Sequence, residues 1–250
     1  MTSEELIKDL NDSCFKMADA ADLYADDILA RADEFKKQVT YYEYGIAGTN
    51  LHRGWYSPSL IEDIVIGNAS RGRLVRNPRK STKPSFRFGF DQNEKIIVVD
   101  RYVYRYDECR HTDSEYIVYE EDTIKGFTFL TENEQFATTG KELVRYSEEK
   151  YHNGLLVLFS YIDFSRFERK PWKFHLETHS VNDLKMHSNF LEYHPADKYY
   201  SNLICDFDID ENGLLVSYCA HIEGSAYYNN YTVTKPRSIR MPRGTVEIEL

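Results

Sequence analysis

The sequence predicts a mainly β protein, in which a large antiparallel meander sheet, open or barrel-like, is accompanied by one long amino-terminal helix. The chain holds 20 Tyr and 14 Phe among 250 residues, and aromatic enrichment favours the pleated, half-buried surface of strands. From residue 86 onward, short segments with a two-residue period follow one another without intervening helices, which is typical of a meander. Residues 3–38 instead repeat apolar side chains at helical spacing.

The helix predicted over residues 3–38 has two contrasting sides. Ser3 is a plausible cap, with Glu4 and Glu5 beside the positive helix end. The apolar stripe contains Leu6, Leu10, Cys14, Met17, Ala21, Tyr24, Ile28 and Phe35. The opposite side is acidic and contains Asp9, Asp12, Asp19, Asp22, Asp26, Asp27, Asp33 and Glu34. We expect the stripe to pack on the sheet, and the acids either to face solvent or to meet a basic partner.

Residues 41–85 are predicted to be an irregular connector between an amino-terminal helical part (1–40) and a β part (86–250), all in one compact unit. A short strand is expected at 41–45, and a short helix at 58–65 that starts near Ser57. The segment SRGRLVRNPRKSTK, residues 70–83, is basic and has no acid; its cations are Arg71, Arg73, Arg76, Arg79, Lys80 and Lys83. Gly72 and Pro78 favour a solvated loop tethered to the acidic helix. Phosphate binding is the alternative, although the aromatic residues of a single-strand binder are missing.

The β part is organised around a repeated hairpin. Residues 202–222, NLICDFDIDENGLLVSYCAHI, place Asn212 and Gly213 between two alternating runs, which is the strongest short-range hairpin signal. The same pattern occurs earlier as FGFDQNEKIIVV, residues 88–99. The predicted strands are 86–90, 95–106, 115–121, 124–130, 142–147, 154–164, 172–178, 189–194, 202–209, 213–222, 230–234 and 245–249.

Composition limits the classes of partner. The formal charge is −10 and the pI is about 5.3, so phosphate backbones are repelled and nucleic acid is an unfavourable partner, whereas a basic protein is attracted. The amino terminus lacks a signal-peptide core and no run of about 20 apolar residues occurs, so we expect a cytoplasmic protein without a membrane segment. The scattered cysteines Cys14, Cys109, Cys205 and Cys219 are expected to be reduced; a disulfide between Cys205 and Cys219 is the alternative.

Two acidic or histidine-rich patterns resemble metal sites. Asp206, Asp208 and Asp210 have the first spacings of a calcium loop, but Glu211 stands at the required Gly and Ser217 at the required Glu. These aspartates therefore face solvent, a cation or a basic partner. His175, Glu177 and His179 share one face of a predicted strand, without the zinc-protease helix pattern.

No catalytic motif occurs in the sequence, so we assign no catalytic residue, cofactor or metal. The alternative is a glycan-directed hydrolase with paired carboxylates in a sheet cleft, because such acids need no local motif. The favoured function is protein binding by acids near turns and by exposed tyrosines. Asp113, Glu115 and Glu149 are expected to add to this acidic surface. The predicted partner-binding residues are Asp107, Glu108, Glu120, Glu121, Asp122, Asp206, Asp208, Glu211, Tyr227, Tyr228 and Tyr231.

The hairpin pattern in residues 86–222 resembles the tyrosine–aspartate repeats of bacterial Rhs-type toxins, and also the sheets of the acidic immunity proteins that accompany polymorphic and contact-dependent inhibition toxins. Repeat shells have many more copies than the two found here, so the immunity proteins are the better match. The resemblance implies a toxin–antitoxin function, in which the protein binds and blocks one cognate, basic toxin domain. It transfers no site residues, because immunity proteins share no common motif.

Overall fold

The computed structural model describes residues 3–47, 52–59, 61–62, 71–79, 82–105, 108–133, 138–152, 155–165, 168–182, 184–210, 214–222 and 228–238. Its elements in chain order are α1 (Ser3–Ala30), α2 (Ala32–Gln38), β1 (Tyr41–Ile46), a 3-10 turn η1 (Gly54–Tyr56), β2 (Arg73–Val75), β3 (Pro84–Phe90), β4 (Ile96–Arg105), β5 (Glu108–Tyr119), β6 (Thr123–Leu130), β7 (Glu132–Asn133), β8 (Thr138–Thr139), β9 (Leu143–His152), β10 (Leu155–Phe164), β11 (Pro171–Asn182), β12 (Lys185–His194), β13 (Tyr199–Ile209), β14 (Leu214–Ile222) and β15 (Tyr228–Ser238).

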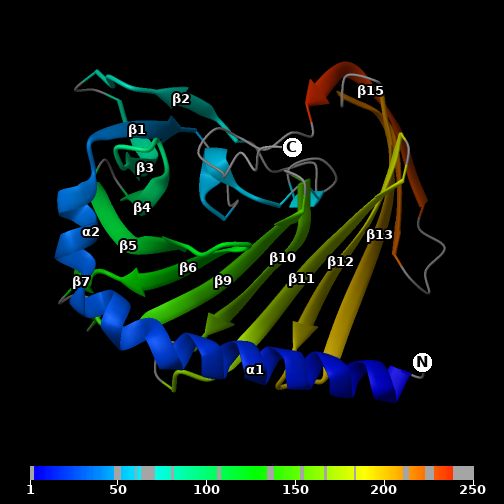
Figure 1. Cartoon of the computed structure of the whole chain (residues 1–250), viewed down its shortest axis with the longest axis horizontal. Coiled ribbons are helices and arrows are strands. Elements are labelled where there is room, and N and C mark those ends of the chain that lie inside the picture. The colour runs from blue at the N-terminus through cyan, green and yellow to red at the C-terminus, as the bar shows by residue number, and fades with distance from the viewer. Residues whose placement is uncertain are drawn as a thin grey trace.

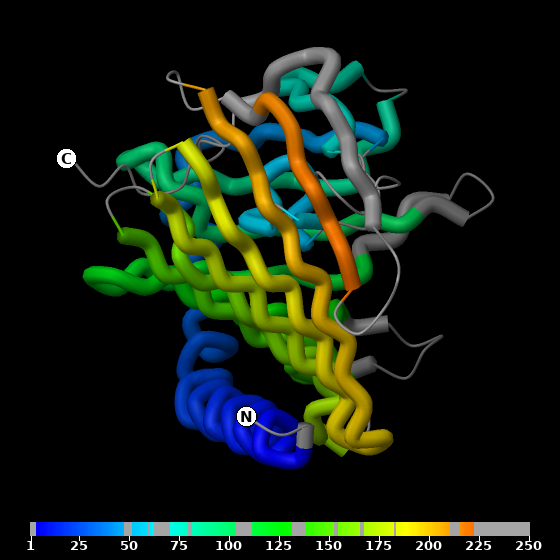
Figure 2. Tube along the Cα trace, turned by 90° about the vertical axis from the view of Figure 1, so that its right-hand side faces the viewer, coloured from blue at the N-terminus to red at the C-terminus, as the bar shows by residue number. Residues whose placement is uncertain are grey.

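One antiparallel sheet dominates the fold. Within the described residues it has 13 strands in the order β15-β14-β13-β12-β11-β10-β9-β6-β5-β4-β3-β1-β2, and β7 and β8 pair separately. Most spatial neighbours are also neighbours in sequence, so the predicted antiparallel meander is confirmed. The sheet curls into an open arc, with α1 across its outer, convex side and η1 inside the arc (Figure 1). Figure 2 shows the later strands side by side and α1 lying to one side of them.

The predicted hairpin at 202–222 is present as β13 and β14, where Leu203 pairs with Ile222 and Cys205 with Ala220. Its loop, 211–213, lies outside the described residues. The earlier copy forms the β3–β4 hairpin. There the Asp91 carboxylate accepts the backbone N–H groups of Asn93 and Lys95, each at 2.9 Å. Both copies of the sequence pattern therefore make antiparallel hairpins.

Most predicted strands are found, but several are longer than predicted. Strand β5 starts at Glu108 rather than 115, β9 continues to His152, and β11 continues to Asn182. These extensions include buried charged residues, which interrupt the apolar alternation on which the prediction depended. Strand β2 was not predicted, and the strand predicted at 245–249 lies outside the described residues.

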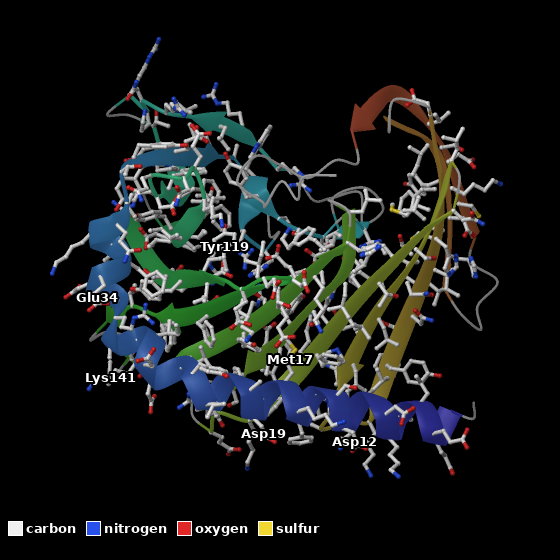
Figure 3. All side chains as sticks on the ribbon, in the orientation of Figure 1. Asp12, Met17, Asp19, Glu34, Tyr119 and Lys141 are labelled. Atoms are coloured by element: carbon white, nitrogen blue, oxygen red, sulfur yellow. The ribbon has the colours of Figure 1, made fainter. Side chains whose placement is uncertain are left out.

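The predicted helix over 3–38 is two helices, because Arg31 leaves helical geometry between α1 and α2. The bend lets α2 turn along the edge of the arc towards β1 (Figure 1). The apolar stripe packs on the sheet as predicted at Leu10, Cys14, Met17, Ala21, Ile28 and Phe35, which are all buried. The prediction that Tyr24 is buried in this stripe is wrong. Tyr24 is 43% exposed, and its ring lies 5.2 Å from the Lys125 ammonium. In Figure 3 Met17 points from α1 to the sheet, whereas Asp12 and Asp19 point away.

The connector is joined to the sheet rather than separate from it, because β1 lies between β2 and β3. The expected strand at 41–45 is therefore present, but the basic segment is not the predicted loop throughout. Arg71 donates to the carbonyl oxygens of Trp55 and Ser57 at 2.6 and 3.1 Å. Arg76 pairs with Glu43 at 3.0 Å. These contacts tie the basic segment to the sheet and connector, whereas we expected a tether to the acidic helix.

Within the short helix expected at 58–65, the structure describes residues 58, 59, 61 and 62, and of these only Ile61 and Glu62 are helical. The Ser59 hydroxyl caps the start of this helix, because it accepts the backbone N–H of Glu62 at 3.0 Å. The predicted cap, Ser57, instead accepts the N–H of Ser59 at 3.3 Å. The start of this helix therefore lies two residues later than the sequence indicated.

The two faces of the sheet have separate cores. The convex face packs against α1 through aromatic side chains such as Phe127, Tyr146 and Tyr193. The concave face holds one cluster around Phe88 and Phe159, and a second around Ile61 and Phe207. Among the described residues, no helix is both long and apolar enough to cross a membrane.

Candidate functional site on the concave face

The connector places Arg53 inside the concave hollow of the sheet. Its backbone is left-handed, with φ of 55°, and its side chain is buried. The following residue, Gly54, also has a positive φ of 50°, and a Cβ there would lie 2.5 Å from the Phe86 ring. Left-handed backbone at a non-glycine residue is costly and persists only where surrounding contacts fix it. Here those contacts are ion pairs with the sheet.

Arg53 joins carboxylates of two strands. Its Nε lies 2.9 Å from each oxygen of Glu115 on β5, and its Nη2 lies 2.7 Å from Oε1 of the same residue. Its Nη1 donates to Glu149 on β9, whose other oxygen accepts the Tyr151 hydroxyl. Gly126 leaves the space for this group, because a Cβ there would lie 2.1 Å from a Glu115 oxygen and 2.6 Å from Arg53 Nη2. A guanidinium that bridges two buried carboxylates is a rigid, desolvated anchor.

Burial and charge set the protonation of this cluster. Burial resists ionisation of Glu115, but Arg53 and His52 outweigh it and hold the pKa of that carboxyl well below its usual range. Burial lowers the pKa of His52 to about 4, although Glu115 acts in the opposite direction. His52 is therefore neutral at neutral pH. Its ring lies against Phe159 at 5.6 Å between centroids, and its Nε2 lies 3.3 Å from Glu115 Oε1.

A second buried cluster contains the predicted row His175, Glu177 and His179. All three side chains are buried on the concave face of β11, so the prediction that they share one face is confirmed. Glu177 accepts the Ser59 hydroxyl at 2.6 Å and the Ile61 N–H at 3.2 Å. These bonds fasten the connector to the sheet at a second point.

The imidazoles of this second cluster lie on either side of the carboxylate. The Nε2 atoms of His179 and His175 lie 3.0 and 3.7 Å from Glu177 oxygens, and His179 Nδ1 lies 2.6 Å from the Ser188 hydroxyl. Burial resists ionisation of Glu177, but contact with the two imidazoles holds its pKa well below the usual range. Among the described residues, no group of three or more His, Cys, Asp or Glu is arranged to hold a metal ion.

A groove of about 730 Å³ opens on the concave side, next to Arg53. Its wall contains two further cross-strand ion pairs. Arg101 Nε lies 2.8 Å from Asp113, and Arg145 donates to both oxygens of Asp163 at 2.6 and 3.0 Å. Trp172, which is 48% exposed, contributes an aromatic surface to the same groove. The groove therefore combines paired charges with one accessible indole.

Three acids that we expected on the surface belong to these clusters instead. Asp113, Glu115 and Glu149 are buried and paired with arginines. The strand period contained the signal for this, because Glu115 and Ile117 are two residues apart and so share a face. An acid on an apolar face requires a buried cation. Arg53 could not be identified as that cation, since its segment has no periodic pattern.

The predicted partner-binding residues are spread over the molecule. Glu120, Glu121 and Asp122 are exposed at the β5–β6 turn, whereas Glu108 lies at the opposite end of β5. Asp206 and Asp208 are exposed on β13, where they contact His187 at 2.7 Å and Lys185 at 3.9 Å. The backbones of Tyr228 and Tyr231 lie in β15. Asp107, Glu211 and Tyr227 lie outside the described residues.

The thiols are reduced in the three described cases, Cys14, Cys205 and Cys219. Cys205 and Cys219 lie on neighbouring strands, but Cys205 pairs with Ala220 and Cys219 with Asp206. Since successive side chains alternate between faces, the two thiols point to opposite faces of the sheet. The alternative of a disulfide between them is therefore wrong.

Comparison with known proteins identifies no relative of the chain: no family model, no curated protein and no solved structure matches it.

Proposed function

We propose that the protein is a non-enzymatic binding protein that neutralises a basic protein partner, as an immunity protein neutralises its toxin, through the outer face of α1. The observation that supports this most is an acidic stripe at seven-residue intervals on α1, made of Glu5, Asp12, Asp19 and Asp26. Seven residues are nearly two helical turns, so these carboxylates recur every 10.5 Å or so on one side of the helix. That side lies opposite the buried stripe, and all four residues are exposed.

Apolar side chains lie within the same acidic face. Phe15 is 47% exposed and Leu23 is 72% exposed, and their eight-residue separation places both beside the acidic stripe. Exposed aromatic and apolar side chains add contact area to a protein interface. The carboxylates between them speed the capture of a basic partner by electrostatic steering.

Exposed acids of the β5–β6 turn lie beside α1. Lys125 of β6 lies 2.7 Å from Glu120 and 5.2 Å from the Tyr24 ring of α1. It therefore links the helix to the β5–β6 turn, where Glu120, Glu121 and Asp122 are exposed. These three predicted partner-binding residues adjoin α1, whereas Asp206 and Asp208 on β13 form a separate surface.

The alternative function, a glycan-directed hydrolase with paired carboxylates, has weaker support than partner binding. The groove acids Asp113, Glu115 and Asp163 are each paired with an arginine. A glycosidase needs one protonated carboxyl as general acid, but Arg53 favours the ionised form of Glu115. Paired acids of this kind suit structure or binding better than acid–base catalysis.

Affinity capture from cells that contain the native gene tests the proposal. The bait is compared with Asp12→Lys/Asp19→Lys and with a control of equal charge change on the other acidic surface, Asp206→Lys/Asp208→Lys. We expect a basic protein that is retained at low salt, released at about 1 M salt, where the Debye length is about 3 Å, and lost with the helix variant only. Retention by the helix variant, or the absence of any basic protein at low salt, contradicts the proposal.

A further inference from the structure

The groove on the concave face has a charge balance unlike that of the whole molecule. Its lining includes three guanidinium groups, from Arg53, Arg101 and Arg145, and three carboxylates, from Asp113, Glu115 and Asp163. His52, also in the lining, is neutral because burial lowers its pKa to about 4. Among the residues that the structure describes, the lining is therefore formally neutral, in a protein of net charge −10. An ionic ligand would meet equal numbers of attractive and repulsive groups there.

Paired charges offer both donors and acceptors to a neutral polar ligand. Each carboxylate has about four acceptor positions and each guanidinium five N–H donors, so one ion pair leaves several of them unused. Arg101 retains an accessible side chain, about half exposed, while its partner Asp113 is buried. These groups hold a fixed array of hydrogen-bonding positions, because ion pairs and packing lock their side chains.

An aromatic surface completes the site. Trp172 is 48% exposed and lines the groove together with Arg145 and Asp163. A half-exposed indole offers an apolar plane to a ligand that has both C–H and hydroxyl faces. The volume, about 730 Å³, lies within the ordinary range of sites for small ligands, which is about 300–1,000 Å³.

We propose that this groove is a binding site for a neutral saccharide, which stacks on Trp172 and exchanges hydrogen bonds with the Arg101–Asp113 and Arg145–Asp163 pairs. The site binds and does not cleave, because each groove carboxylate is held in an ion pair. The groove is built from strand side chains and the connector, so this proposal is independent of partner binding by the outer face of α1.

Titration calorimetry of the full chain tests the site. The probes are neutral oligosaccharides of glucose, galactose, mannose and N-acetylglucosamine, each with two to four sugars, together with a uronic acid oligomer and a neutral peptide of similar size. The variants are Trp172→Ala, which removes the stacking surface, and Arg101→Lys, which keeps the charge but loses the planar fork. Leu184→Ala is the control, because it removes a half-exposed apolar side chain that lies outside the groove and outside α1.

We expect at least one neutral oligosaccharide to bind with one site per chain. Trp172→Ala and Arg101→Lys should each weaken that binding about 10-fold or more, while Leu184→Ala leaves it unchanged. Three results overturn the proposal: no neutral oligosaccharide binds at concentrations near 1 mM, only the uronic acid or the peptide binds, or binding persists in Trp172→Ala. Circular dichroism of each variant verifies that the sheet is intact, so that loss of binding is not loss of folding.

Discussion

The guanidinium of Arg53 donates to both oxygens of Glu115, with distances of 2.7 to 2.9 Å, although the two residues are 62 positions apart. This pair holds the connector inside the concave sheet. The same guanidinium also reaches Glu149 on β9. A connector with little regular structure is thereby fixed to two strands by charge rather than by apolar packing alone.

Removing the cation should destabilise the protein strongly. Arg53→Met leaves Glu115 and Glu149 buried without their positive partner, and breaking a buried ion pair costs about 3–5 kcal/mol. We expect a loss of that size in the free energy of unfolding, measured by urea denaturation. The matched control is Arg169→Met, which breaks an exposed pair with Asp22 and should cost less than about 1 kcal/mol. Equal losses in the two variants would show that the Arg53 cluster is not an anchor.

Gly126 should not tolerate a side chain. A Cβ at this position would lie 2.1 Å from Glu115 Oε1 and 2.6 Å from Ser147 Oγ, so Gly126→Ala must displace the ion pair. We expect a loss of about 1–3 kcal/mol, the usual cost of overpacking. Gly45→Ala is the control, because its nearest contact is a ring atom of Phe88 at 3.2 Å. Comparable urea midpoints for the two alanine variants would contradict this packing.

The free energy of unfolding should decrease as the pH is lowered, at pH values above those at which the carboxylates titrate. Burial lowers the pKa of His52 to about 4, whereas an unfolded histidine has a pKa of about 6.5. Between these values the unfolded state binds more protons, so this contribution is complete above about pH 6.5 and is lost as pH falls towards 4. Its size is on the order of 3 kcal/mol. Below about pH 4.3, Glu115 and Glu177 extend the loss, since both have lowered pKa values in the folded state.

Urea denaturation at a series of pH values between 4.5 and 7, about the window set by these pKa values, measures the effect. His52→Gln should flatten the pH dependence of the unfolding free energy in this window. His152→Gln changes an exposed histidine at the end of β9 and should leave the slope as it is in the wild type. An unchanged slope in His52→Gln would mean that His52 is not buried in its neutral form.

The cysteines should differ in reactivity. Burial raises the pKa of the Cys14 thiol to about 11 and that of the Cys205 thiol to about 12, and the thiolate is the reactive form. Iodoacetamide at mildly alkaline pH should therefore modify half-buried Cys219 before Cys14 and Cys205, as followed by peptide mass spectrometry. In urea all four cysteines should react at similar rates. Rapid modification of Cys14 in the native protein would contradict the packing of α1 on the sheet.

The sequence was sufficient for the meander and its hairpins, because a two-residue period and Asn-Gly turns are local signals. It was insufficient to predict which acids lie on the surface and which of them lie near one another. Glu108 and Glu120 are both predicted to bind the partner as acids near turns, yet they lie at opposite ends of the 12-residue strand β5, which is about 35–40 Å long. The buried acids Glu115 and Glu149 were missed because their partner, Arg53, comes from a connector with no periodic pattern. The side of α1 that faces outward was predictable, since helical period alone separates its acids from its apolar stripe.

Neutralisation of the captured basic partner tests the proposed function most directly. Cells that express this partner are grown with the wild-type chain, with Asp12→Lys/Asp19→Lys, or with Asp206→Lys/Asp208→Lys. We predict that the partner stops growth, that the wild-type chain and the β13 variant restore it, and that the helix variant does not restore it. Full protection by the helix variant, at the same protein level as the wild type, would contradict the proposal that the acidic face of α1 binds the partner.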